Sequence, residues 1–194
     1  MKLVRFAENG TARYGVLDGD IVRPTDATTL QDALAITGLD ALPVPLKTLD
    51  LLAPVERPRK ILGIGVNYAA HAAESVSFVD TKSPQVQKWF NKQATSANKP
   101  FGRVHLPKVS DQLDYEVELV AVIGKHGRHV PRERAMEIVA GFCVGCDYSV
   151  RDWQRASQTM IMGKGFDTHA PFGPHLVTLE EVGELGPQAI RCFV

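Results

Sequence analysis

Short runs of alternating apolar and polar residues predict a small antiparallel meander at the start of the chain. Glycine-containing turns separate the runs, which comprise residues 2–6, 13–17 and 21–22 with turns at Asn9-Gly10 and Asp18-Gly19. Asn-Gly and Asp-Gly readily adopt the positive φ angles that tight hairpin turns require. Thr29 then has the hydroxyl of a helix N-cap, and the apolar residues after it fall near helical spacing.

The most regular alternation in the chain covers residues 113–123 and predicts a β-strand. Apolar side chains occupy its odd-numbered positions, whereas Glu116 and Glu118 lie on the even-numbered face. Since strand side chains alternate with a period of two, both carboxylates point the same way. Val120 and Val122 make this face apolar again, which indicates that it is covered. The alternative is a half-exposed antiparallel strand with a wet outer face.

Further apolar runs predict a second, larger region of mixed structure. The expected strands are residues 60–64, 140–146 and 172–178, and the expected helices are residues 67–75 and 133–139, with a further helix start at Glu180-Glu181. Residues 76–107 show only weak periodicity, which is typical of an ordered binding loop or a lid. Residues 189–194 resemble a strand that has begun without a partner.

Prolines divide the chain near residue 58. Several of them interrupt the periodic segments just before this point, and residues 55–60 have the composition of a linker. We therefore expect a small α+β domain at residues 1–57 and a larger, metal-binding domain at residues 58–194.

Composition and charge narrow the class of protein. Hydrophobic residues make up 44% of the chain, and 22 basic side chains balance 22 acidic ones. Balanced charge gives no reason to expect nucleic-acid or membrane binding, and no apolar run approaches the roughly 20 residues of a membrane span. The N-terminal segment lacks the apolar core of a signal peptide, and three cysteines do not make a disulfide framework. We expect a soluble, cytoplasmic protein with no nucleic-acid or membrane partner.

The two strand carboxylates are the first candidates for chemistry. Like charges this close repel each other, and their burial is costly without a compensating cation. A hard divalent ion supplies that cation and prefers carboxylate oxygens, so Glu116 and Glu118 are candidate metal ligands. Asp147 follows the apolar run 140–146, at a strand end where functional side chains often emerge. Taken by itself, however, an acidic residue there is more often a turn-former or a helix N-cap.

Three further groups have the chemistry of a functional site. His71 and Glu74 are three positions apart, so on a helix the carboxylate orients the imidazole and raises its basicity; an incidental surface ion pair is the alternative. Lys164 stands between two glycines, where it either approaches a ligand and stabilises negative charge on an oxygen or is an exposed loop lysine. Cys143 and Cys146 have redox or zinc spacing, but their apolar surroundings predict buried hydrophobic side chains.

Four blocks in this order resemble the fumarylacetoacetate hydrolase family and together cover residues 60–178 almost without a gap. They are Ile64-Gly-Val-Asn-Tyr-Ala-Ala-His71-Ala-Ala-Glu74, Leu113-Asp-Tyr-Glu116-Val-Glu118-Leu119, Asp147-Tyr-Ser-Val-Arg151-Asp152-Trp153-Gln154, and Gly163-Lys164-Gly-Phe-Asp167-Thr168 followed by Gly173-Pro174. The resemblance implies an α+β, mostly β fold: a mixed β-roll or barrel with a small N-terminal domain. It also implies a homodimer.

The same resemblance implies roles for individual residues. These are metal ligands at Glu116, Glu118 and Asp147, catalytic residues at His71, Glu74 and Lys164, and substrate contacts at Gln154, Arg151 and Tyr68. The implied metal is most often Mg²⁺, with Mn²⁺ or Ca²⁺ as alternatives, and the implied partner is a small 2-oxo acid substrate.

The implied reaction is hydrolysis of a carbon–carbon bond in an acylpyruvate-like 2,4-dioxo acid, as in aromatic catabolism. The alternatives are isomerisation or decarboxylation of unsaturated 2-oxo diacids, and a non-catalytic relative that only binds metal or a 2-oxo acid. Two features depart from the family pattern. Val66 replaces the arginine or leucine that precedes Asn-Tyr in many members. Members also continue past the point where this chain stops, so we expect the C-terminal part of the β-roll to be missing.

Overall fold

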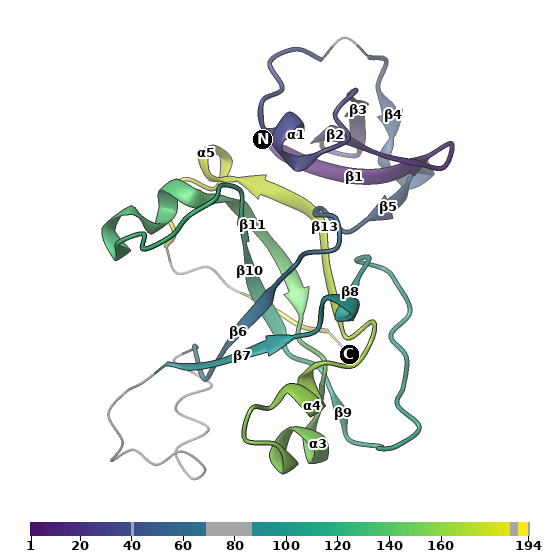
Figure 1. Cartoon of the computed structure of the whole chain (residues 1–194). Coiled ribbons are helices and arrows are strands. Elements are labelled where there is room, and N and C mark those ends of the chain that lie inside the picture. The colour runs from purple at the N-terminus through teal and green to yellow at the C-terminus, as the bar shows by residue number, and fades with distance from the viewer. Residues whose placement is uncertain (40, 69–86, 187–189, 194) are drawn as a thin grey trace.

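The computed structural model describes residues 1–39, 41–68, 87–186 and 190–193, and β-strands dominate it (Figure 1). The strands of its N-terminal part are β1 Lys2–Glu8, β2 Thr11–Asp18, β3 Ile21–Pro24, β4 Val44–Pro45 and β5 Asp50–Leu52. Among them lie the short helix α1 Leu30–Leu34 and the 3₁₀ turn η1 Leu46–Thr48. Thr29 caps α1 as predicted, since its Oγ1 accepts a hydrogen bond from the Asp32 N–H at 3.2 Å.

The predicted meander is confirmed. Strands β1, β2 and β3 pair antiparallel in chain order. At the first turn Asn9 and Gly10 have φ angles of 49° and 79°, and at the second Gly19 has 56°. These left-handed values are the ones that Asn and Gly adopt most readily, which is why the two dipeptides identify the turns in the sequence.

The other described residues add one long antiparallel hairpin, several short strands and five short helical elements. The strands are β6 Ile61–Gly65, β7 Lys88–Lys92, β8 Ala97–Asn98, β9 Leu113–Asp114, β10 Val117–Ile123, β11 Val139–Cys146, β12 Ser149–Val150 and β13 Ala170–Thr178. The helical elements are the 3₁₀ turns η3 Ala94–Ser96 and η4 Arg132–Ile138 and the α-helices α3 Arg151–Ala156, α4 Ile161–Lys164 and α5 Leu179–Val182. The strands predicted at residues 60–64, 140–146 and 172–178 are therefore present. The strand predicted at residues 113–123 is instead two strands, β9 and β10, which are separated at residues 115–116 and pair in different sheets.

One large sheet organises these strands in the order β10-β11-β13-β1-β2-β3-β4, with β5 paired to β1 and β8 to β13. Its pairs are antiparallel apart from β8 with β13, which is parallel, so the sheet is mixed. Two small ribbons, β6 with β7 and β9 with β12, lie beside it. The expected mixed, β-rich fold is confirmed, although the strands of the described residues do not close into a barrel.

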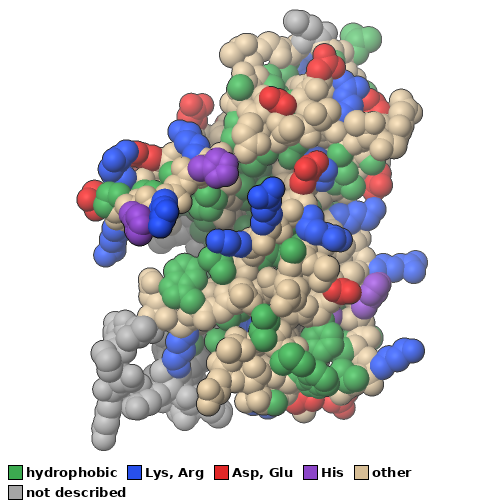
Figure 2. Space-filling model, in the orientation of Figure 1, with side chains coloured by type: hydrophobic (Ala, Val, Ile, Leu, Met, Phe, Trp, Pro, Cys, Tyr) green, Lys and Arg blue, Asp and Glu red, His purple; other side chains and the backbone are tan. Residues whose placement is uncertain are grey.

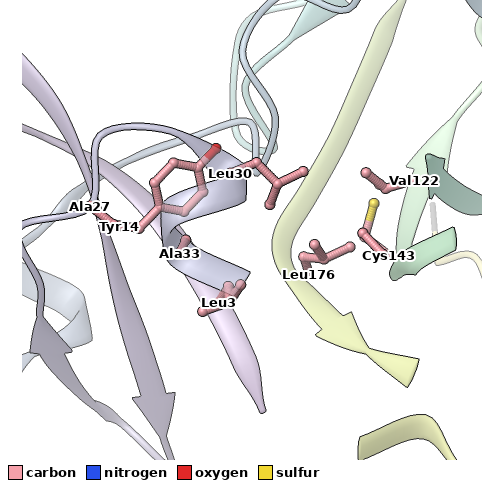
Figure 3. Close-up of a cluster of buried hydrophobic side chains, with 9 residues drawn as sticks. Leu3, Tyr14, Ala27, Leu30, Ala33, Val122, Cys143 and Leu176 are labelled. Carbon is pink, nitrogen blue, oxygen red and sulfur yellow. The ribbon is translucent and has the colours of Figure 1, made fainter. Parts of the chain in front are cut away.

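Pairing between β1 and β13 joins the N-terminal meander to the rest of the sheet. Leu3 lies opposite Leu176 in this pair, and both side chains are fully buried. They belong to a cluster that draws Tyr14 from the N-terminal part and Val122 and Cys143 from β10 and β11 (Figure 3). Because sheet and core both run across the proline-rich linker, the division at residues 57 and 58 stays a prediction.

Three segments differ from the expectations. The helix predicted at residues 133–139 is the 3₁₀ turn η4, because it starts at Pro131 without a side-chain cap and β11 begins at its end. Residues 190–193 form no strand, contrary to the pattern read at residues 189–194. The described part of the weakly periodic segment contains β7, η3 and β8. The helix predicted at residues 67–75 lies almost entirely outside the described residues.

The surface carries both signs of charge. Acidic and basic side chains both appear on the face in Figure 2, in line with their equal numbers in the chain. Within the described residues, no helix has the length and apolar character needed to cross a membrane. The outward face of β10 and β11 carries the large exposed apolar residues Leu119, Ile123 and Val144. The opposite face carries the candidate site residue Glu118.

Candidate active site

Two carboxylates lie at the start of β10, toward its inner face. Val122 on this face is buried, whereas Leu119 and Ile123 on the other face are exposed. The covered face expected from the sequence is therefore present, and the wet-face alternative is wrong. Glu118 lies on β10, so its side chain follows the direction of Val122. Glu116 immediately precedes the strand, and its side chain is placed by contacts with Ser149 and Lys164.

Asp147 brings a third carboxylate to the same corner of the sheet. It follows β11, and its N–H donates to the Glu116 carbonyl oxygen at 2.7 Å, so the two backbones meet directly. Asp147 is only 8% exposed. Buried Ser149 completes the contact, because its hydroxyl donates to Glu116 Oε1 at 2.5 Å and to the Asp147 carbonyl oxygen at 3.1 Å. A simple turn-former would be exposed, so that alternative for Asp147 is wrong.

The ammonium of Lys164 bridges two of the carboxylates. Its Nζ lies 2.6 Å from Glu116 Oε1 and 2.5 Å from Asp147 Oδ2, and the side chain is 2% exposed. Lys164 ends α4, and Gly163 before it allows α4 to pack against α3: a Cβ on Gly163 would lie 2.3 Å from the Gln154 nitrogen. The exposed-loop alternative for Lys164 is therefore wrong.

Lys92 is a site residue that the sequence placed only within a candidate binding loop or lid. Its Nζ lies 2.6 Å from Asp147 Oδ1 and 2.9 Å from the Tyr148 carbonyl oxygen, and the residue is 6% exposed. Burial lowers the pKa of Lys92, attraction to Asp147 opposes this, and repulsion from Lys164 adds to it. The only feature of the sequence that could have indicated its burial is the alternation within β7, because Lys92 lies on the same buried face as Phe90. A lysine is so seldom buried that the pattern alone does not single it out.

Two predicted substrate contacts lie beside Glu116. Arg151 begins α3, and its Nε donates to Asp114 Oδ2 at 2.8 Å. Its Nη1 lies 3.2 Å from Glu116 Oε1 and donates to Gln154 Oε1 at 2.9 Å. Arg151 therefore connects the Glu116 carboxylate to Gln154. Contact of Arg151 and Gln154 with a substrate stays a prediction.

The two strand glutamates have opposite pKa shifts. Burial disfavours the charged form of Glu116, but the Lys164 ammonium, the Ser149 hydroxyl and the Arg151 guanidinium together outweigh it and hold the pKa of Glu116 below its usual value. Burial raises the pKa of Glu118, the two neighbouring carboxylates add to this, and the Tyr68 hydroxyl opposes it. Tyr68 is held there because its Oη accepts a hydrogen bond from the Leu119 N–H at 3.0 Å. A further cation beside Glu118 would therefore stabilise its charged form.

The chemistry of the donor set suits a hard divalent ion, because three carboxylates supply oxygen ligands at one corner of the sheet. Among the described residues, however, no three acidic, His or Cys side chains are grouped so that they could hold an ion. The geometry gives the reason: the Lys164 ammonium bridges Glu116 and Asp147. Metal binding by Glu116, Glu118 and Asp147 therefore stays a prediction that their oxygen donors support.

The structure gathers most of the predicted site residues at this corner. Those that it brings together are Tyr68, Glu116, Glu118, Asp147, Arg151, Gln154 and Lys164. The remaining two, His71 and Glu74, lie outside the described residues.

Cys143 and Cys146 do not share a site. They are three positions apart on β11, so their side chains leave opposite faces of the strand. Cys143 is 5% exposed within the hydrophobic cluster, and burial raises the pKa of its thiol to about 12. The geometry argues against a redox or zinc centre built on this pair.

We expect Cys143 to resist thiol reagents in the native protein. With a pKa of about 12, only about one thiol in 10⁴ is ionised at pH 8, and the thiolate is the reactive form. Exposed Cys192 reacts first, which a Cys192→Ser variant checks by removing the fast phase. Labelling is followed by mass spectrometry of peptides, in buffer and in urea. Native Cys143 labelled as fast as Cys192 would contradict the burial described above.

Comparison with known proteins identifies relatives along the whole chain. A family model described as fumarylacetoacetate (FAA) hydrolase, C-terminal, matches residues 60–194, and one described as Rv2993c-like, N-terminal, matches residues 1–54. The mitochondrial oxaloacetate tautomerase FAHD2A of Homo sapiens is 42% identical over 156 residues, which are 79% of this chain and 48% of that protein. The chain spans about half the length of the curated relatives it matches.

Solved structures share the fold. A fumarylacetoacetate hydrolase from Exiguobacterium antarcticum matches with a TM-score of 0.77 at 31% identity, over 93% of this chain and 67% of that one. A 5-carboxymethyl-2-hydroxymuconate delta-isomerase from Mycobacterium smegmatis matches with a TM-score of 0.75 at 30% identity, over 92% and 67%. These relatives are named for three different reactions.

Proposed function

The chain belongs to the fumarylacetoacetate hydrolase family, whose members are enzymes, and on this premise we propose that it enolises a small 2-oxo diacid of the oxaloacetate type. In this tautomerisation a proton leaves the carbon beside the 2-oxo group and a proton is added to the 2-oxo oxygen. Atoms and charge therefore balance without an oxidant or reductant. Relatives named oxaloacetate tautomerase, at 42%, 39% and 41% identity, support this substrate class.

The observation that carries the proposal is the pair of buried ammonium groups at Lys92 and Lys164. They contact opposite oxygens of one carboxylate, Asp147 Oδ1 at 2.6 Å and Oδ2 at 2.5 Å. Enolisation develops negative charge on the former carbonyl oxygen, and buried, pre-oriented cations stabilise such charge far better than water does. In the proposed complex Lys164 faces the enolate oxygen and Lys92 a carboxylate of the diacid.

Two further contributions are proposed from the sequence. A divalent ion bound by Glu116, Glu118 and Asp147 would supply Lewis-acid polarisation of the 2-oxo group. His71, oriented by Glu74, would accept the proton that leaves carbon and so act as a general base. The homodimer and the cytoplasmic location expected from the sequence remain predictions as well.

Hydrolysis of an acylpyruvate-like 2,4-dioxo acid, the reaction expected from the sequence, is the second candidate. The spacing of His71 and Glu74 favours it, because an imidazole oriented by a carboxylate also activates water. Cleavage would release a pyruvate enolate, so the Lys92 and Lys164 ammonium groups would stabilise its negative charge in the same way. Isomerisation of an unsaturated 2-oxo diacid also begins with an enolate.

A substrate panel tests the proposal. The enol form of oxaloacetate is followed by its ultraviolet absorbance with the protein and Mg²⁺, and we expect equilibration at least about tenfold faster than in buffer. A chelator and the His71→Ala variant should each remove most of this acceleration. An acylpyruvate and an unsaturated 2-oxo diacid complete the panel.

The outcomes separate the candidates. Cleavage of the acylpyruvate without faster tautomerisation would replace the first candidate by the second. No acceleration of any substrate with Mg²⁺, Mn²⁺ or Ca²⁺ would contradict both. Thermal stabilisation by oxaloacetate without any turnover would identify a non-catalytic, ligand-binding relative.

A further inference from the structure

The Lys164 ammonium has a third neighbour besides the two carboxylates that it bridges. Its Nζ lies 4.6 Å from the centroid of the Phe90 ring, within the distance at which an aromatic face attracts a cation. Phe90 is 8% exposed and Lys164 2%. Because so little water reaches the pair, the attraction is at the stronger end of its range.

Pairing of β7 with β6 places the Phe90 ring in this position. Phe90 lies opposite Gly63 in the ribbon. A Cβ on Gly63 would lie 2.2 Å from Phe90 Cζ and 2.7 and 2.8 Å from its two Cε atoms. The ring therefore occupies space that only a glycine leaves free. Two residues further along the same face, Lys92 contacts Asp147, so one strand supports both ammonium groups.

The surroundings of Phe90 distinguish it from an ordinary core residue. Neither of the two buried apolar clusters within the described residues includes it; they are built around Leu3 and Leu176 in one case and Val4 and Phe6 in the other. A ring that only filled the core would be expected in such a cluster. Phe90 instead lies between the Gly63 backbone and a buried cation.

We infer that Phe90 is a positioning residue that holds the Lys164 ammonium against Glu116 and Asp147, in the orientation that faces the enolate oxygen. The carboxylates fix Nζ on one side, and the ring restricts the remaining motion of a long, flexible side chain. The effect on turnover rests on the proposed function. The contact between ring and ammonium does not.

Ring fluorination tests the inference without changing the shape of the side chain. Fluorine withdraws electron density from the ring face, so one, two and three fluorines at Phe90 should lower kcat stepwise, by about fivefold to tenfold in total, with KM changed less than about twofold. Phe90→Tyr should retain activity, and Phe90→Leu and Gly63→Ala should lose a similar amount. Trifluorophenylalanine in place of Phe6, a fully buried core residue, is the control and should leave kcat unchanged.

A second readout does not need turnover. The urea midpoint of the full chain should fall stepwise with fluorination at Phe90, and this dependence should vanish in a Lys164→Met background. The inference would be overturned if the enzyme is active and its kcat does not change with fluorination at Phe90. So would a urea midpoint that responds equally with Lys164 present or replaced. If no substrate is turned over, the proposed function fails, and the urea cycle alone decides whether Phe90 holds Lys164.

Discussion

The variant Lys164→Met is expected to lower kcat for oxaloacetate tautomerisation by about 10²- to 10³-fold, the effect of removing one preorganised donor to a developing oxyanion. Lys164 Nζ is the cation that contacts both Glu116 and Asp147, and it is almost completely buried. Methionine keeps the length and much of the volume of the side chain but removes the charge. Negative charge on the substrate oxygen would then lack its nearest partner, so the transition state is destabilised more than the bound substrate.

Lys125→Met is the matched control for this variant. Lys125 is exposed and follows β10 at the end opposite the carboxylates, so its loss should change kcat less than about twofold. Steady-state kinetics on both variants with Mg²⁺ provide the comparison, and circular dichroism checks that each is folded. A Lys164→Met enzyme within about threefold of the unchanged protein would remove Lys164 from the proposed mechanism.

Local periodicity was sufficient to predict the carboxylate pair at the start of β10. Alternation predicts that Glu116 and Glu118 face the same way, and the burial of Val122 shows that this face is covered. The hairpin turns and the Thr29 cap follow from equally local rules, since each depends on one or two residues. These features need no information about the rest of the fold.

Asp147 shows what periodicity does not reveal. By local rules it is a turn-former, yet its oxygens contact Lys164, 17 residues away, and Lys92, 55 residues away. Such contacts depend on how β7, β11 and α4 meet, which no short window of sequence specifies. Only the order of the four sequence blocks singled out Asp147, through the resemblance to a family.

The buried contact of Lys92 with Asp147 was not predicted for a related reason. Strand β7 has five residues, and its inner face is defined only by pairing with β6, which lies across residues 69–86 in the chain. A strand this short gives too few alternations to separate it from a loop. The η4 segment shows a different limit: its composition suits an α-helix, but the structure has a 3₁₀ helix that begins without a side-chain cap and ends directly at β11.

The variant Asp147→Asn is expected to destabilise the protein by about 3–5 kcal/mol, the effect of breaking a buried ion pair by removing one partner. One carboxylate lies between two buried ammonium groups, with Lys92 on Oδ1 and Lys164 on Oδ2. Asparagine keeps the shape but replaces one oxygen by an NH₂ group. A donor then faces a donor, and the charge that balanced two cations is gone.

Urea unfolding in the presence of a chelator measures this effect without any contribution from a metal, and an unchanged m-value would show that only stability has changed. Exposed Asp111 provides the control, since Asp111→Asn should change the unfolding free energy by less than about 0.5 kcal/mol. Adding Lys92→Met to Asp147→Asn removes one of the two unbalanced ammonium groups, so it should restore part of the loss, on the order of 1–2 kcal/mol. If Asp147→Asn alone leaves the urea midpoint unchanged, or if Lys92→Met adds its full cost to it, then Asp147 does not balance two buried cations. The charge arrangement on which the proposed enolate stabilisation depends would then be absent.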